Sequence, residues 1–299
     1  METALYHPEY GYYRRRRDPF GTSGDFCTAE QVQPVFGLLV AACIRQLYRE
    51  MGEPREFTVV ELGAGRGEMA EAFREWRYIP VEIDSGGLPN GFVGLVFSNE
   101  FFDALPVDVA VREGEAFREQ QVACEDGRFR WTTGGPVPAE VERYLRDCFP
   151  SPEQGRWYEA SLEAPRWMER IARSLEDGYA LTIDYGYTRG EAARFPAGTL
   201  MGYRRHTARE AVLEEPGERD ITAHVNFTAL QEAGAARGLR TERFETLART
   251  LLRAGEPDQF AAALNASEPR EQLRRRMQLK TLLFGMGETF RALLQRRRR

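Results

Sequence analysis

Lysine is almost absent from the sequence, and the basic charge comes from arginine. Lys280 is the only lysine among the 41 basic residues, and the 299-residue chain has a formal net charge of −5. General binding to nucleic acid depends on an excess of positive charge, so we do not expect it here. The arginine runs at 14–17 and 296–299 are local exceptions, which we interpret as solvated surface or tail.

Cysteine and histidine are also scarce. The four cysteines form no Cys-x-x-Cys pair, and the three histidines are equally dispersed. A zinc site needs such ligands at close spacing, so we predict no metal site. The pattern favours free thiols, and therefore a reducing, cytoplasmic compartment.

Long apolar runs are missing as well. The mean hydropathy is −0.52, and no run approaches the ~20 apolar residues that span a membrane. The first 13 residues lack the basic-then-apolar pattern of a signal peptide. With 42% hydrophobic residues the chain can still bury a core, as one large α/β domain or as a domain with a cap.

The stretch around which the sequence is organised is FTVVELGAGRG, at 57–67. Its first four residues are β-branched or aromatic, which is typical of a buried strand. Gly63, Gly65 and Gly67 then alternate through a turn, and we expect a helix to follow. Such a turn forms a ligand cradle, because missing Cβ atoms let a ligand approach the backbone N–H groups.

The residues beside the glycines indicate which ligand the cradle takes. A dinucleotide fingerprint has its third glycine three positions after the second, where this chain has Glu68, a carboxylate that would repel a pyrophosphate. S-adenosylmethionine (SAM) has no phosphate, and its ammonium and sulfonium are attracted to a carboxylate at the strand end. The alternative is a glycine-rich turn without a ligand. We predict that SAM binds at Glu61, Gly63, Ala64, Gly65 and Gly67.

The first 35 residues are rich in aromatic residues, glycine and proline. The segments YHPEYGYY at 6–13 and FGTSGDFCTA at 20–29 exclude both a long helix and a disordered arm. We expect an ordered N-terminal arm over 1–35 that covers the cofactor site. Its predicted contacts to the adenosine part are Asp25, Phe26 and Thr28. The alternative is that the aromatic residues only seal the edge of the sheet.

A further strand is predicted at 78–83, with acidic residues near its end. In nucleoside-binding sheets, an acid at the end of the second strand binds both ribose hydroxyls, because a carboxylate accepts two hydrogen bonds. Glu82 is our candidate, and Asp84 is its rival. Residues 85–92 are too few for a crossover helix, so either one strand–helix unit is missing or this strand is the third.

An apolar strand at 93–97 leads into the sequence SNEFFDALP. Active sites of open parallel sheets lie beyond the carboxyl ends of the strands. We predict that Asn99 contacts the cofactor, as does Glu100, and that Glu100 and Asp103 lie on one side of a helical turn. The alternative is an ordinary helix start, because Asn and Asp are common caps.

The rest of the chain alternates between predicted strands and helices. Residues 107–160 have the pattern of hairpins with a turn at Asp126-Gly127 and a short helix, and we expect them to form an inserted cap. A buried strand at 178–183 ends in Asp184, another acid at a strand tip. Helices are expected over 34–51, 139–149, 161–175, 228–237 and 273–294, the last forming a C-terminal region with the basic tail over 271–299.

Several motifs together resemble one family. ALYHPEYGYY, FGTSGDFCTA, ELGAGRG, SNEFFDALPVD, DYGY and DITAHVNFTAL, in this order, are similar to segments of the MidA-like SAM-dependent methyltransferases. The resemblance covers nearly the whole chain. This chain departs from the family in one stretch: the part between the glycine turn and the SNEFFDALP segment is shorter here than in the family.

The resemblance implies a Rossmann-like class I methyltransferase fold: a mostly parallel α/β sheet with an antiparallel last strand, in a single domain over 1–299. It also implies a SAM-dependent enzyme, whose mitochondrial members are complex I assembly factors that methylate protein arginine. The expected partner is a protein with an exposed arginine, and a homodimer is one candidate oligomeric state.

An arginine acceptor is a cation, so carboxylates are needed to hold it and to accept a proton. We predict that Glu100 and Asp103 do so, with assistance from Asp184 or Asp220. Two alternative functions are a SAM-binding assembly chaperone without catalysis and a small-molecule methyltransferase.

Overall fold

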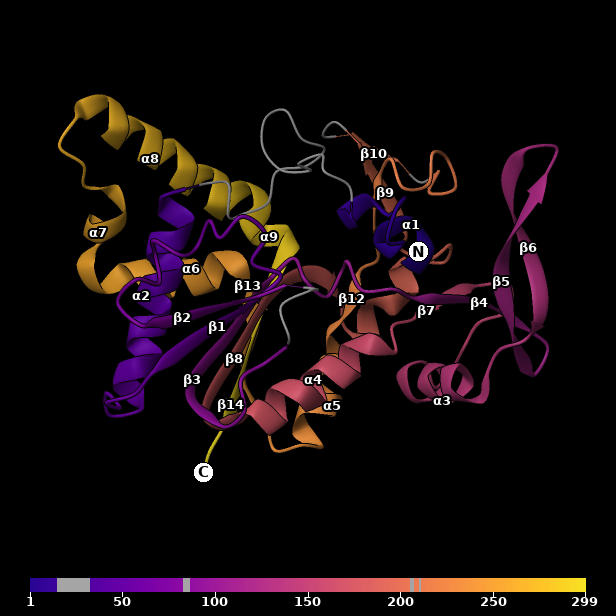
Figure 1. Ribbon diagram of the computed structural model, residues 1–299, viewed down its shortest axis with the longest axis horizontal. Coiled ribbons are helices and arrows are strands. Elements are labelled where there is room, and N and C mark those ends of the chain that lie inside the picture. Colours follow the sequence, from indigo (N-terminus) through magenta and orange to yellow (C-terminus); the bar gives the residue numbers. More distant parts are fainter. Residues whose placement is uncertain (15–32, 83–86, 205–206, 210) are drawn as a thin grey trace. The chain divides into compact units, whose positions relative to one another are not determined.

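The structure is a computed structural model of the chain, and it describes residues 1–14, 33–82, 87–204, 207–209 and 211–299. Figure 1 shows the helices and strands, coloured along the sequence; the chain divides into two compact units, each assembled from three separate stretches. The first unit comprises Met1–Cys27, Asp103–Arg166 and Tyr187–Leu230. The second unit comprises Thr28–Phe102, Trp167–Gly186 and Gln231–Arg299.

The second unit is organised around a sheet with the strand order β13-β14-β8-β3-β1-β2. The pairs β1–β2, β1–β3 and β3–β8 are parallel, whereas β14 runs antiparallel to both β8 and β13. The expected mostly parallel sheet with an antiparallel last strand is therefore confirmed. The strands are β1 (Thr58–Leu62), β2 (Arg77–Val81), β3 (Phe92–Asn99), β8 (Leu175–Tyr187), β13 (Arg240–Thr246) and β14 (Phe290–Arg297).

The position of β2 answers the question of strand order. β2 lies directly beside β1, with Thr58 opposite Arg77 and Leu62 opposite Val81. The strand predicted at 78–83 is thus the second strand, and it forms the edge of the sheet among the described strands. In the described part of the chain between β2 and β3 there is no helix, so one strand–helix unit is missing, which was one of the two alternatives.

Apolar side chains cover both faces of this sheet. On β1, Val59 belongs to a cluster with residues of the helices α2 (Val35–Glu50) and α6 (Leu247–Gly255). Val60 and Leu62 alternate to the opposite face and are buried as well. Burial on both faces explains why β1 reads as a continuous apolar run instead of an alternating one.

The other helices of the second unit confirm most of the helices predicted from sequence. α2, α4 and α5 correspond to the expected helices at 34–51, 161–175 and 228–237. Of these, α4 (Glu163–Ser174) and α5 (Phe227–Ala235) begin in the first unit and end in the second. The remaining helical elements of the second unit are η4 (Glu256–Asp258), α7 (Ala261–Leu264), α8 (Pro269–Thr281), η5 (Leu282–Met286) and α9 (Gly287–Thr289).

The prediction of a C-terminal helix over 273–294 is confirmed as far as residue 289, through α8, η5 and α9, and is wrong over 290–294. Residues 290–297 form β14, which pairs on both sides, with β8 and with β13. Its short apolar run is buried, and such a run cannot be told from a helical segment by periodicity alone. The basic tail also starts inside the strand: Arg296 is 9% exposed, its guanidinium lies 4.5 Å from the Tyr179 ring centre, and it pairs with Asp177 at 2.6 Å.

The helix expected after the glycine turn is wrong as well. Residues 65–75 form successive turns. Their backbone bonds mix two spans: Ala70 donates to Gly67 and Phe73 donates to Met69. Left-handed glycines lie just before and within this segment and β2 begins soon after it, so little chain is left for a regular helix.

The first unit is built from two antiparallel sheets with short helices. A four-stranded sheet has the order β6-β5-β4-β7 and a three-stranded sheet has the order β10-β9-β11. The predicted hairpin turn at Asp126-Gly127 joins β5 and β6, with φ of +49° and +71°. The elements are α1 (Glu2–Tyr6), η1 (Tyr12–Arg14), β4 (Asp108–Glu113), β5 (Ala116–Glu125), β6 (Arg128–Pro136), α3 (Ala139–Cys148), β7 (Trp157–Ala160), η3 (Arg189–Arg194), β9 (Met201–Arg204), β10 (Thr207–Arg209), β11 (Asp220–Thr222) and β12 (Val225–Asn226).

The described N-terminal residues pack within this first unit. Leu5 and Tyr12 are buried in a cluster with Val212 and Ile221. The aromatic segment is therefore folded into short helical turns instead of a long helix, as its glycines and proline indicate. The remainder of the predicted arm, including Asp25, Phe26 and Thr28, lies outside the described residues.

Candidate functional site

The turn after β1 consists of three glycines in the left-handed backbone region. Gly63, Gly65 and Gly67 have φ values of +66°, +54° and +73°. A side chain would be strained at these positions, and a Cβ on Gly63 would lie 3.1 Å from Cδ2 of Phe101. The turn therefore presents backbone atoms at the carboxyl end of β1, with the buried Ala64 between the first two glycines. This is the geometry of the predicted cradle.

Glu82 reaches this turn from the neighbouring strand. It directly follows β2, and its Oε1 accepts a hydrogen bond from the Gly65 backbone N–H at 2.5 Å. The side chain is exposed. The structure thus brings the predicted ribose-binding acid to the glycine turn. The rival, Asp84, lies outside the described residues.

Glu61 lies beneath the turn and is shielded from solvent. Its side chain is 0% exposed, and its Oε2 accepts a hydrogen bond from the Tyr78 hydroxyl at 2.5 Å. A buried carboxylate needs such donors to remain stable. Glu61, the predicted acid at the strand end, is therefore next to the turn in the chain, but its side chain is buried in the protein interior.

The end of β3 carries a buried polar atom that fits a ligand. Asn99 is 4% exposed, and its Nδ2 donates to Oε1 of Glu100 at 3.2 Å. Its Oδ1 is buried and accepts no hydrogen bond from the described residues. Leaving a buried acceptor unsatisfied costs about 1–3 kcal/mol, which a ligand donor would offset. The glycine cradle, Glu82 and this oxygen together fit an adenosyl cofactor.

Glu100 has a strained backbone. Its φ is +49°, in a region that costs a non-glycine residue about 1–2 kcal/mol. Its N–H donates to the Ile183 carbonyl at 3.0 Å, which holds the residue at the carboxyl ends of β3 and β8. Strained residues of this kind cluster at functional sites.

Asp184 fixes the segment that follows Glu100. It is 0% exposed, its Oδ2 accepts from the Phe102 N–H at 3.1 Å, and its Oδ1 accepts from the Tyr185 N–H at 2.9 Å. Both oxygens of this predicted acid are thus bound to backbone. The geometry is that of a clamp between the end of β8 and residue 102.

Two further predicted acids lie in the first unit, beside a tyrosine. Asp103 and Asp220 are each 4% exposed. The Tyr13 hydroxyl donates to Oδ1 of Asp220 at 2.8 Å, and the Asp103 carbonyl accepts from the Ala223 N–H at 2.9 Å. Burial, and then the charges of Asp220, Tyr6 and Asp103, raise the pKa of Tyr13 well above its usual range. Tyr13 therefore stays protonated and donates.

Sequence reasoning missed the role of these tyrosines. Tyr6 stacks on Tyr13 at 5.6 Å between ring centres, and its hydroxyl donates to the Ala104 carbonyl at 2.8 Å. Together they tie the N-terminal segment to the chain around Asp103 and Asp220. The only signal in the sequence was the density of aromatic residues at 6–13.

Another buried acid of the first unit, Glu159, was not predicted from the sequence. It is 6% exposed and accepts hydrogen bonds from the Thr199 N–H at 2.5 Å, the Thr199 hydroxyl at 2.7 Å and the Leu200 N–H at 3.1 Å. Burial raises its pKa. The same Thr199 hydroxyl accepts from the His224 backbone N–H at 2.9 Å, which agrees with a structural role for that histidine segment.

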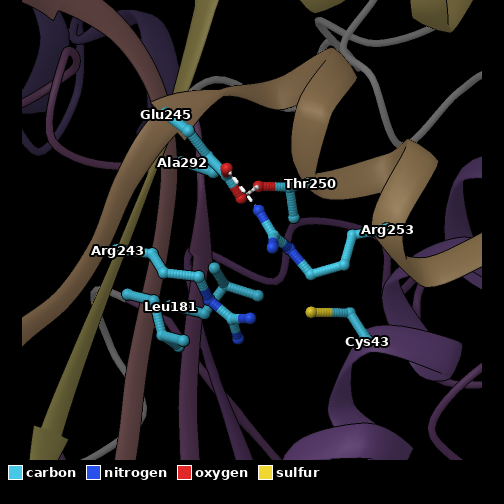
Figure 2. A pocket seen from close by; sticks show the side chains of 8 residues that line it. Cys43, Leu181, Arg243, Glu245, Thr250, Arg253 and Ala292 are labelled. Atoms are coloured by element: carbon cyan, nitrogen blue, oxygen red, sulfur yellow. Dashed lines mark hydrogen bonds and ion pairs between the residues drawn. The ribbon is translucent and has the colours of Figure 1, made fainter.

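A small pocket in the second unit lies apart from these residues (Figure 2). Glu245 accepts from the Thr250 hydroxyl at 3.0 Å and from Nη2 of Arg253 at 2.5 Å, and burial raises the pKa of the Cys43 thiol to about 11. The thiol is therefore protonated and unreactive at neutral pH. None of its described lining residues belongs to the predicted site. They are Cys43, Leu181, Arg243, Glu245, Thr250, Arg253, Ala292 and Leu294.

Two features are absent from the part of the chain that the structure describes. No group of three or more His, Cys, Asp or Glu side chains in the described part of the chain is arranged to hold a metal ion. Among the helices formed by those residues, none has the length and apolar character needed to cross a bilayer.

Comparison with known proteins identifies one family. A family model described as "Putative S-adenosyl-L-methionine-dependent methyltransferase" matches residues 72–245, more than half of the chain. A crystal structure of a superfamily member from Burkholderia thailandensis, bound to S-adenosyl-homocysteine, is 28% identical with a TM-score of 0.86. That similarity covers 99% of this chain and 86% of the other.

The curated relatives are matched over a smaller share of their own length. "Protein arginine methyltransferase NDUFAF7 homolog, mitochondrial" of Drosophila melanogaster is 29% identical over 80% of this chain and 66% of its own length. The mitochondrial protein arginine methyltransferase NDUFAF7 of Xenopus laevis is 24% identical over 77% of this chain and 64% of its own. The chain thus spans slightly less than two thirds of these relatives.

Proposed function

The chain belongs to this family of SAM-dependent methyltransferases, and on that premise we propose that it methylates an arginine side chain of a protein. The names of the curated relatives support an arginine acceptor. The concentration of carboxylates at and after the ends of β3 and β8 supports a cationic acceptor in general.

In this proposal the cofactor is held mainly by backbone. SAM, when bound, supplies a methyl group that its sulfonium makes electrophilic. Glu82 binds the ribose, Asn99 offers its buried Oδ1 to a donor, and Glu61 contributes negative potential from beneath the turn. The glycine cradle comprises Gly63, Ala64, Gly65 and Gly67. A contribution from Asp25, Phe26 and Thr28 stays a prediction.

Glu100 and Asp103 hold the acceptor. A guanidinium is protonated at neutral pH and has five N–H donors, so paired carboxylates orient one nitrogen and accept the proton released when the C–N bond forms. The observation that carries this assignment is the strained φ of +49° at Glu100, a residue fixed by Ile183 and bonded by Asn99. Asp184 and Asp220 assist by position: Asp184 holds Phe102, and Asp220 is itself held by Tyr13.

The test replaces each acid by its neutral isostere. We expect Glu100→Gln and Asp103→Asn to reduce methyl transfer from labelled SAM to arginine-containing peptides and proteins by about 10²-fold or more. Measured by calorimetry, the affinities for SAM and S-adenosyl-homocysteine should stay the same for Asp103→Asn and should change by far less than about 10²-fold for Glu100→Gln, since Glu100 is also predicted to contact the cofactor. Glu53→Gln is the matched control, because Glu53 is an exposed carboxylate that also has a left-handed φ, of +55°.

Other outcomes separate the alternatives. Normal methylation by both variants would refute the assignment of the two acids. Label found only on small molecules would refute the protein acceptor. SAM binding without any methylated product would support an assembly chaperone, and tight binding of NAD in place of SAM would remove the premise.

The chemical class of the partner and the compartment of the chain are separate questions. A net charge of −5 disfavours nucleic acid as the acceptor. The cytoplasmic compartment and the homodimer stay predictions, and the curated relatives are named as mitochondrial proteins.

A further inference from the structure

The helical segment formed by α8 and η5 exposes large apolar side chains to solvent. Leu273 is 63% exposed, Met277 is 57% exposed and Phe284 is 79% exposed. These are three of the seven large hydrophobic residues that are exposed in the described part of the chain. Removing large apolar side chains from water is favourable, so their common exposure marks an interaction surface.

The three side chains share one face of the helix. Their positions, together with Lys280, are separated by four, three and four residues, which is the spacing of a helix–helix seam. The opposite face is anchored: Leu282 is 0% exposed, and Nε2 of Gln278 donates to the Gln33 carbonyl. The apolar residues are therefore held outward by the fold of the second unit.

Positive charge surrounds this seam. Arg274 and Arg275 both pair with Glu271, at 2.7 and 3.0 Å. Arg270, Arg276 and Lys280 are exposed, and no ion pair joins them to the described residues. We define the α8 face as Arg270, Leu273, Arg276, Met277, Lys280 and Phe284. The face is cationic on a chain whose net charge is −5.

From this charge pattern we propose that the α8 face docks an amphipathic helix of a protein partner, with an apolar seam flanked by Asp or Glu. Such a helix would bury the three apolar side chains and neutralise the three cations. That this partner is the methyl acceptor rests on the proposed function, whereas the docking itself does not.

Two other occupants fit the face less well. A second copy of the chain would set the same cations against each other across a two-fold axis. An anionic membrane fits less well because Lys280 interrupts the apolar seam at its centre, where a bilayer would need a continuous apolar face.

The test uses a synthetic helix as probe. A fluorescein-labelled peptide with Leu at the heptad a and d positions and Glu at e and g is titrated with the full chain and followed by anisotropy. Its like charges keep it from pairing with itself. We expect binding that weakens at high salt, at least a tenfold increase in Kd for the double variant Met277→Ala/Phe284→Ala, and a similar increase for Arg276→Glu/Lys280→Glu.

The controls separate docking from folding and from catalysis. Val122→Ala/Phe129→Ala removes two side chains that are 49% and 47% exposed on the β5–β6 hairpin, and it should leave Kd unchanged. SAM affinity and methylation of a short arginine peptide should be unaffected by the α8 variants. A failure of methylation in the unmodified chain would count against the proposed function alone.

Three results would overturn the proposal. The acidic helix fails to bind, or binds all variants equally. Phosphatidylserine vesicles bind the chain while the helix does not, and the α8 variants abolish that binding. Sedimentation shows a dimer of the chain that the α8 variants dissociate.

Discussion

The two units hold their predicted site residues by different physical means. In the second unit, the turn after β1 is a backbone structure: three left-handed glycines present N–H groups, and Glu82 joins them from the adjacent strand. In the first unit, Asp103 and Asp220 are placed by side chains, because Tyr6 and Tyr13 hold the segments around them. One region is encoded over a few neighbouring residues, and the other depends on residues about two hundred positions apart.

This difference predicts different sensitivities. A backbone cradle tolerates changes in side-chain chemistry but not the addition of a Cβ atom. A site held by side-chain hydrogen bonds responds to the loss of a single hydroxyl, even when shape is kept. Three substitutions test the comparison, in order of decreasing effect.

The largest effect is expected from Gly65→Ala. Gly65 has a φ of +54° and donates its N–H to Glu82, so an added methyl group strains the turn that is proposed to hold SAM. We expect the Kd for SAM, measured by calorimetry, to rise about 100-fold, which corresponds to about 2.7 kcal/mol.

Gly114→Ala is the matched control for that substitution. Gly114 has a nearly identical φ of +57°, and a Cβ there would meet no other atom within 4 Å. The control should lose a similar amount of stability and keep its SAM affinity. Equal SAM affinities in the two variants would show that the turn after β1 is not the cofactor cradle.

An intermediate effect is expected from Tyr13→Phe. The substitution keeps the ring that stacks on Tyr6 and removes the hydroxyl that donates to Asp220. If side-chain hydrogen bonds hold the acids of the first unit in place, kcat for methylation should fall about tenfold while the Kd for SAM stays the same. The size of this effect follows from the worth of one hydrogen bond to a charged group, about 1.5–3 kcal/mol.

Tyr158→Phe provides the comparison for Tyr13. Tyr158 is a buried tyrosine of the same unit whose hydroxyl accepts from the Glu153 N–H at 2.7 Å, away from the predicted acids. Its loss should lower stability without changing kcat. A Tyr13 variant with normal kcat at saturating substrate would remove Tyr13, and its hold on Asp220, from the proposed mechanism.

The same contrast explains what the sequence could reveal. The cradle, Glu82 and the acids at the ends of β3 and β8 were predicted because strand, turn and acid lie within short segments. The neighbour relation of Tyr13 and Asp220 could not be predicted, since nothing local relates residues 207 positions apart. The two backbone N–H groups that bond both carboxylate oxygens of Asp184 could not be predicted from the sequence either.

The errors in the predicted elements have a similar origin. The sheet and most helices follow from apolar periodicity, but β14 was taken for a helix because its apolar run gains its partners only from β8 and β13. β13, which is polar and half exposed, gave no strand signal of its own. Pairing across the sheet decided both cases, and pairing is not visible in a single segment.

The smallest effect concerns the buried acid Glu159. Burial raises its pKa, so the folded state binds a proton more tightly than the unfolded state does. The stability that this proton contributes is fully present below the ordinary pKa of a glutamate and is lost as the pH rises through the raised, folded-state value. The free energy of unfolding of the natural chain should therefore fall with rising pH relative to that of Glu159→Gln.

We expect that difference to develop as the pH rises above the ordinary pKa of a glutamate, and denaturant unfolding at a series of pH values measures it. Glu113→Gln is the control, because Glu113 is half exposed in its pair with Arg118 and should show no such pH-dependent difference. The amide of Glu159→Gln keeps an acceptor for the Thr199 and Leu200 N–H groups, so the loops stay in place. A difference of the opposite sign would mean that the three hydrogen bonds to Glu159 outweigh its burial, and that this carboxylate is held as an anion.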